Sequence, residues 1–284
     1  MMKKLICAFL LTAVFPLPFC SCDRIPAETS DSTNENLKST PLSTSNINID
    51  GITYADAVIG RAIAYELSEL FPNQQQTEEM LLAIKTLGFF GEYDEFGNEQ
   101  EIDLVDIPRL INLEHLSVYD CYIRDISPLN QLSYLRKLST LNTIVSNVAA
   151  LRDMKSLEEV CFIKSQIDSW DFIRGAKNLR ILDIGDAWFT SDSSLLAELK
   201  DLEELVALCA PIEDISVLRN LTKLRKLYCV ANESDIPVLM ELKQLEVLYI
   251  SDSGTLEMIE QLQTALPNTE VSADYALINA ADAG

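Results

Sequence analysis

The segment LINLEHLSVYDCYIRDISPLNQ, residues 110–131, decides the fold, because its pattern returns along the rest of the chain. Its apolar residues stand at offsets 0, 3, 6 and 8, as Leu110, Leu113, Leu116 and Val118. Further units in the same register begin at Leu132, Met154, Ala176, Leu199, Leu221 and Leu242. A repeat period of about 22 residues predicts an array in which each unit buries its leucines against its neighbours.

Each unit is predicted to contain one short strand. The residues at offsets 6 and 8 then point inward, while those between and after them face solvent. An earlier, longer unit starts at Leu81 and contains an acidic segment, and a half-unit ends the array at Val271. Before the repeats, the stretch DAVIGRAIAYELSELF, residues 56–71, has the periodicity of an amphipathic helix.

This arrangement resembles the bacterial leucine-rich repeat family, specifically the 22-residue class typified by the internalins, over roughly residues 53–271. The resemblance implies an α/β fold, a right-handed solenoid with a parallel β-sheet on the concave face and short helical or 3-10 arcs on the convex face. It places a helical N-terminal cap at residues 51–80 and the repeats at 81–271, as about eight units plus a terminal half-repeat. A C-terminal tail follows at 272–284.

The N-terminus predicts export. Residues 1–21 combine two lysines with an apolar stretch that prolines interrupt, as in a secretory signal peptide. The end of this stretch resembles a bacterial lipobox and makes Cys22 the residue that would be acylated, with plain signal-peptidase cleavage as the alternative. The Ser/Thr-rich composition of residues 22–50 predicts a disordered tether. We therefore expect a protein that is lipid-anchored to the bacterial cell envelope, at the cell surface.

The composition argues against several functions. With 22 Lys+Arg and 44 Asp+Glu, the formal net charge is −22, which disfavours nucleic acid as a partner. His115 is the one histidine, and its position before Leu116 places it on the solvent side of a strand. No second histidine and no Gly-rich phosphate loop accompany it, so we expect no catalytic residues, no metal, no cofactor and no enzyme activity.

Two other groups of residues have open alternatives. The acidic segment Glu92–Asp106 could bind Ca²⁺, but its spacing is not that of an EF-hand, which favours a solvated loop. Four cysteines remain after the signal peptide and Cys22, and their offsets differ too much for pairing with one another, so we expect four free thiols. They are Cys121, Cys161, Cys209 and Cys229.

The outward strand positions predict a binding surface. They should be polar if they only met water, yet many are apolar or aromatic. The candidate partner-binding residues on the concave face are Phe90, Tyr119, Leu141, Ile163, Leu208, Tyr228, Val230 and Tyr249. The alternative is that the tail or the tether covers them.

These features together predict a monomeric, non-catalytic module, anchored to the membrane by its lipid, that recognises a protein partner through its concave face. One alternative is a scaffold that organises proteins of the same cell envelope. Another is a solute-binding lipoprotein, which is disfavoured because a solenoid offers an open face rather than a closing cleft.

Overall fold

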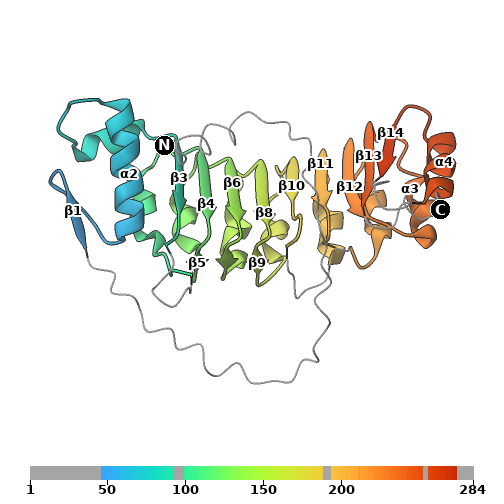
Figure 1. The fold of residues 1–284 in the computed structure, drawn as a ribbon, viewed down its shortest axis with the longest axis horizontal. Coiled ribbons are helices and arrows are strands. Elements are labelled where there is room, and N and C mark those ends of the chain that lie inside the picture. Colours follow the sequence, from blue (N-terminus) through green and yellow to red (C-terminus); the bar gives the residue numbers. More distant parts are fainter. Residues whose placement is uncertain (1–45, 93–98, 188–192, 211, 252–254, 274–284) are drawn as a thin grey trace, which may run out of the picture. The chain divides into compact units, whose positions relative to one another are not determined.

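One strand from each repeat joins a single parallel sheet of nine strands (Figure 1). The computed structural model describes residues 46–92, 99–187, 193–210, 212–251 and 255–273. The signal peptide, Cys22, most of the tether and nearly all of the tail lie outside the described residues. In spatial order the strands are β3 (Thr86–Phe90), β4 (His115–Tyr119), β6 (Lys137–Leu141), β8 (Glu159–Ile163), β10 (Ile181–Asp183), β11 (Glu204–Ala207), β12 (Lys226–Val230), β13 (Val247–Ser251) and β14 (Glu270–Ala273).

The predicted inward positions form the core. Leu116 and Val118 of β4 are buried completely, and the corresponding pair is buried in each of the other repeat units through β13. In β14, Val271 is buried and Ala273 is partly buried. Adjacent strands pair without offset, so that Leu116 lies opposite Leu87 and Leu138. The eight predicted units contribute one strand each, and the terminal half-repeat contributes the ninth, β14.

The return arcs are 3-10 helices, as predicted. They are η1 (Glu78–Ala83), η2 (Leu104–Arg109), η3 (Ser127–Gln131), η4 (Val148–Asp153), η5 (Asp171–Arg174), η6 (Ser193–Glu198), η7 (Ile215–Asn220) and η8 (Glu233–Asp235). A second parallel sheet of β5 (Tyr122–Ile123), β7 (Ile144–Val145) and β9 (Gln166–Ile167) lies between strand and arc in three units. Side chains cap several arcs, and Asp103 accepts a hydrogen bond from the Val105 backbone at 3.0 Å.

Helices close both ends of the array (Figure 1). At the N-terminal end, α2 (Ala57–Leu70) buries Val58, Ile59, Ile63 and Leu67, whereas Leu70 is exposed. At the other end, α3 (Ile236–Leu239) and α4 (Leu256–Ala265) precede β14. In the described ranges, no helix has the length and hydrophobicity that a membrane-spanning segment requires.

The tether prediction is wrong at its C-terminal end. Ile47–Ile49 forms strand β1, which pairs antiparallel with β2 (Ile52–Tyr54). The turn between them uses Asp50 and Gly51, both with positive φ, which Gly adopts without strain and Asp tolerates better than most residues. Ile47 and Ile49 alternate along β1 and pack partly buried against the core, so this stretch gains enough burial to order.

A buried carboxylate joins the cap to the first repeat. Asp56, only 2% exposed, accepts hydrogen bonds from the backbones of Val58 and Ile59 at the start of α2, at 2.8 and 3.0 Å. Its other oxygen accepts from the Asp103 backbone at 3.1 Å. Asp106 in turn accepts from the backbones of Ala55 and Asp56. The cap is therefore held by polar groups as well as by its apolar face.

Candidate functional site: the outward face of the sheet

Four predicted binding residues lie side by side at the N-terminal end of the sheet. Phe90, Tyr119, Leu141 and Ile163 are direct register partners on β3, β4, β6 and β8. The rings of Phe90 and Tyr119 stack, with centroids 4.5 Å apart and planes 20° apart, and Phe90 is 44% exposed. We call these four residues the N-terminal apolar group.

The other four predicted residues gather at the opposite end. Tyr228 and Tyr249 are register partners on β12 and β13, with ring centroids 6.1 Å apart. Val206 on β11 is the next partner in the same row, and each of these side chains is half-buried. We call the following five residues the C-terminal apolar group: Val206, Leu208, Tyr228, Val230 and Tyr249.

Strand β10 separates the two groups, so the outward face is not one continuous apolar patch. Gly185 stands where the neighbouring repeats have Ile163 and Leu208. The Asp183 carboxylate fills part of this space, because its Oδ1 accepts a hydrogen bond from the Gly185 backbone at 2.9 Å. A Cβ atom at residue 185 would lie 3.2 Å from that oxygen.

The surroundings of Asp183 disfavour its charged form. Burial, followed by the charges of Glu204, Glu159 and Asp186, raises the pKa of Asp183 to about 6, against the lowering effect of the Gly185 hydrogen bond. The two glutamates lie on the strands next to Asp183, Glu204 on β11 and Glu159 on β8. Each forms an ion pair with a lysine of the next strand away from Asp183, Glu204 with Lys226 at 3.0 Å and Glu159 with Lys137. Within the described ranges, no cation forms an ion pair with Asp183 itself.

A row of alternating charges borders the sheet where the strands begin. Each member accepts a backbone hydrogen bond from the next, for example from Arg180 N to Glu158 O at 2.8 Å. The row forms four exposed ion pairs, such as the two-bond pair of Arg180 with Glu203 at 3.0 and 2.9 Å. Its members are Lys85, Glu114, Arg136, Glu158, Arg180, Glu203, Arg225 and Glu246.

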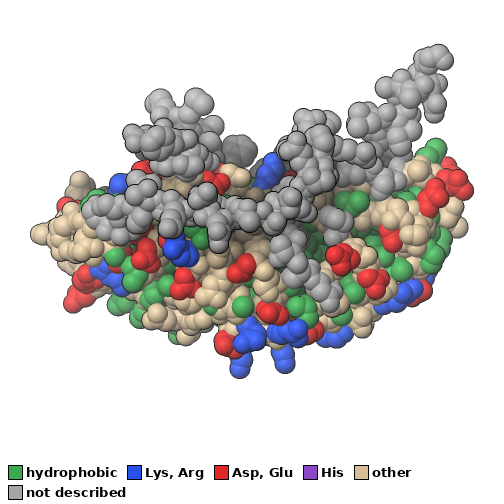
Figure 2. Space-filling model, turned by 90° about the horizontal axis from the view of Figure 1, so that it is seen from below, with side chains coloured by type: hydrophobic (Ala, Val, Ile, Leu, Met, Phe, Trp, Pro, Cys, Tyr) green, Lys and Arg blue, Asp and Glu red, His purple; other side chains and the backbone are tan. Residues whose placement is uncertain are grey.

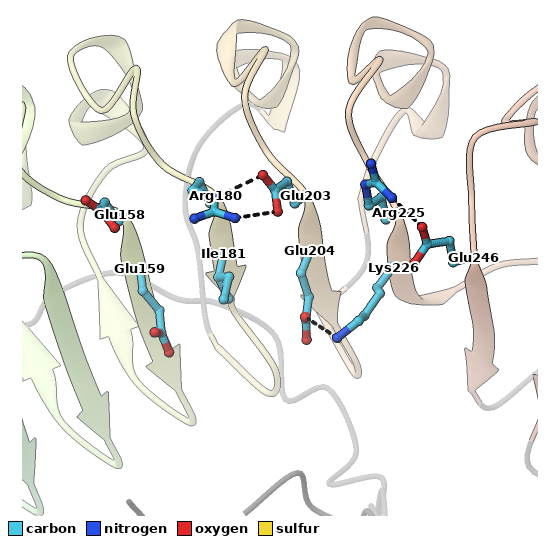
Figure 3. A pocket seen from close by; sticks show the side chains of 9 residues that line it. All are labelled: Glu158, Glu159, Arg180, Ile181, Glu203, Glu204, Arg225, Lys226 and Glu246. Carbon is cyan, nitrogen blue, oxygen red and sulfur yellow. Dashed lines mark hydrogen bonds and ion pairs between the residues drawn. The ribbon is translucent and has the colours of Figure 1, made fainter. Parts of the chain in front are cut away.

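The C-terminal part of this charge row, from Glu158 to Glu246, lines a hollow of about 350 Å³ (Figure 3). The hollow extends down the sheet past Ile181 to Glu204 and Lys226. Four positive and four negative side chains leave the row neutral. Exposed ion pairs contribute only about 0–1 kcal/mol each, so the row is better described as a polar border than as a source of stability.

Sequence reasoning missed this row, although a signal was present. The row occupies offset 4 of each unit, and its sign alternates without exception from Lys85 to Glu246. A comparison of the offset-4 residues of successive units would have revealed the alternating charges. The prediction concentrated on offsets 7 and 9, where apolar side chains stand out.

The cysteine prediction needs a correction. Cys121, Cys161 and Cys229 are free, but Cys209 is disulfide-bonded, so the expectation of four free thiols is wrong. That expectation compared the repeat cysteines only with one another, and among those three no pairing occurs. Burial raises the pKa of each free thiol to about 12, which leaves them protonated and poorly nucleophilic at neutral pH.

Two glutamates of the acidic segment in the first unit form ion pairs with residues of other elements. Glu92 pairs with Arg61 and Glu101 with Arg124, whereas residues 93–98 lie outside the described residues. His115 begins β4 and is half-buried. In the part of the chain that is described, no three His, Cys, Asp or Glu side chains converge as metal ligands.

Comparison with known proteins supports the fold. No protein-family model matches the chain, and no curated protein matches its sequence. Among solved structures, internalin C2 from Listeria monocytogenes is 25% identical, with 78% of this chain and 94% of that chain covered and a TM-score of 0.62. The array is a leucine-rich-repeat solenoid.

Two further solenoids match more weakly. Another internalin from Listeria monocytogenes is 18% identical, with 83% of this chain and 99% of that chain covered, at a TM-score of 0.35. A leucine-rich-repeat protein from Leptospira interrogans is also 18% identical, with 62% and 41% covered, at a TM-score of 0.43. Within this leucine-rich-repeat solenoid, the candidate site is the outward face of the nine-stranded sheet.

Proposed function

We propose that this protein is a non-catalytic recognition module that binds a protein partner through the outward face of its sheet. The observation that carries the proposal is the row Phe90, Tyr119, Leu141 and Ile163, four large apolar side chains in register on positions that face outward. Single exposed apolar residues are ordinary, but a row of neighbours suggests an interaction site.

The remaining outward face has the features of an interface. Tyr228 and Tyr249 offer rigid aromatic area, and tyrosine is enriched among the residues that dominate binding energy. The charge row adds polar groups along the edge where the strands of this sheet begin, and a protein interface combines an apolar core with polar groups around it. At about 4.8 Å per strand, the sheet offers about 38 Å of length, which is sufficient for a protein epitope.

The charge of the chain favours a basic partner. The formal net charge is −22, and in Figure 2 acidic side chains (red) are spread over the visible surface, with Lys and Arg (blue) among them. Such a field speeds association with positively charged partners and slows it with acidic polymers.

A capture experiment tests the recognition proposal. The full-length protein is crosslinked in lysates of its own cell envelope and of foreign cells, alongside the variants Tyr228→Asp, Tyr119→Asp and the control Tyr134→Asp. Tyr134 is 59% exposed and lies outside the sheet, in the loop before β6. Partners identified this way are then bound in purified form to each variant.

We expect each face variant to weaken binding at least 30-fold, the effect of losing about 2 kcal/mol at a hot spot, while the control stays within twofold. Equal binding by all variants would contradict recognition through this face. If the partner comes from the cell's own envelope, the protein acts as a scaffold there.

Lipid anchoring through Cys22 is the second part of the proposal. Two or three acyl chains, each contributing about 0.8 kcal/mol per buried CH₂, would hold the protein firmly on a membrane. Wild-type protein should then partition into the detergent phase and carry an acyl mass on its N-terminal peptide, whereas Cys22→Ala should not. Added protease that digests the protein on intact cells would place it at the cell surface, and protection would place it inside the envelope.

A further inference from the structure

One carboxylate interrupts the apolar row of the outward face. Ile163 on β8 and Leu208 after β11 are two strand steps apart, or about 10 Å. Gly185 lies between them in the row. It has no side chain, and the Asp183 carboxylate lies next to it, where a side chain of residue 185 would begin. A partner that covers both apolar groups must therefore also cover Asp183.

Covering an anion without a counter-charge opposes binding, because an unpaired buried carboxylate loses its hydration. Among the described residues, the groups that face Asp183 give it no such charge. Glu159, Glu204 and Asp186 are acidic, the register partner Cys161 is a neutral thiol, and Lys137 and Lys226 already pair with the two glutamates. The hydrogen bond from Gly185 engages only one carboxylate oxygen. The counter-charge must then come from the partner.

We propose that the partner presents a lysine or arginine flanked on both sides by apolar side chains, and that this cation pairs with Asp183 while its neighbours contact the two apolar groups. This inference rests on the proposed function and names the chemistry that the face selects. Because binding requires the charged form of Asp183, whose pKa in the free protein is about 6, the affinity falls as this carboxylate is protonated.

A displayed peptide library tests the inference without knowledge of the natural partner. Random twelve-residue peptides are selected on the immobilised full-length protein, and the selected peptides are then measured by fluorescence polarisation at pH 7.5 and pH 5.0. The variants are Asp183→Asn, Tyr228→Asp and the control Asp153→Asn. Asp153 is exposed at the end of η4, so its substitution removes the same charge away from the sheet.

The inference expects selected peptides to share a central Lys or Arg with apolar residues on both sides. Their affinity for the wild type should fall roughly tenfold from pH 7.5 to pH 5.0, and this fall should vanish in Asp183→Asn but persist in Asp153→Asn. Selected peptides that lose binding in Tyr228→Asp but contain no shared basic residue would overturn the inference and leave the proposed function standing. Peptides whose affinity and pH dependence are unchanged in Asp183→Asn would do the same. Peptides whose binding survives Tyr228→Asp would count against both.

Discussion

The carboxylate of Asp56 should be one of the most important polar groups for stability, and Asp56→Ala tests this. The substitution leaves three backbone N–H groups, those of Val58, Ile59 and Asp103, without their acceptor. A buried donor that loses its acceptor costs about 1–3 kcal/mol. Because Asp103 is exposed and water can reach its backbone, we expect a loss of about 3–4 kcal/mol in the free energy of unfolding.

Urea unfolding followed by far-UV circular dichroism measures this loss. Asp103→Ala is the matched control, since the exposed Asp103 side chain caps η2 through one hydrogen bond to Val105, which contributes about 1 kcal/mol. Loss of the Asp56 cap should also release α2 and expose the end of the core, because a solenoid needs its caps. If Asp56→Ala proved no more destabilising than Asp103→Ala, the argument that this buried carboxylate holds the cap would be refuted.

Three other predictions concern the repeats. Burial raises the folded-state pKa of Asp183 from 3.8 to about 6, so the neutral form of this side chain favours folding. The free energy of unfolding should therefore fall by on the order of 2 kcal/mol as the pH rises from below about 4 through 6. Asp183→Asn should remove this loss in urea titrations at pH 4 and pH 7. Ser165→Ala should lower the free energy of unfolding by about 2 kcal/mol, measured by thermal unfolding, because the buried Thr140 hydroxyl loses its hydrogen-bond partner at 2.8 Å. Adding Thr140→Val should restore part of this loss. If the effects of the two substitutions simply added, the hydrogen bond between these hydroxyls would not be the cause. Gly175→Ala should cost on the order of 3 kcal/mol or prevent folding, since its Cβ would lie 1.2 Å from a carbonyl oxygen of the previous repeat. Gly88→Ala, whose Cβ meets nothing closer than 3.9 Å, should stay within about 0.5 kcal/mol, and a similar loss in both would show that the close approach is not the cause.

The periodic part of the fold was predictable because it repeats. Each unit has the same inward positions, so an error in one unit would be visible against the other units, and Leu116 and Val118 are buried as their offsets require. The non-repeating parts were harder. Ile47–Ile49 lies in a stretch whose overall composition resembles a tether, and only its pairing with β2 orders it.

The candidate site was predictable by position but not by grouping. Alternation along each strand placed residues such as Tyr119 and Tyr228 outward, and they lie on the outward face of the sheet. The Asp183 carboxylate lies in the apolar row because it accepts a hydrogen bond from the Gly185 backbone, within the same repeat. The pairing of charge-row neighbours such as Arg180 and Glu203 joins residues of adjacent repeats, which a single unit does not contain.

By itself, then, the sequence determined the repeat, its period, the inward leucines and the strands that carry them, because burial of a periodic apolar pattern allows one way of stacking the units. Only the tertiary structure decided how the outward side chains meet. Electrostatic and hydrogen-bonding interactions depend on distances of a few ångströms between side chains. The register of neighbouring strands sets those distances. In the part of the chain that the structure describes, Glu159 and Glu204 each pair with a lysine, whereas Asp183 pairs with no cation.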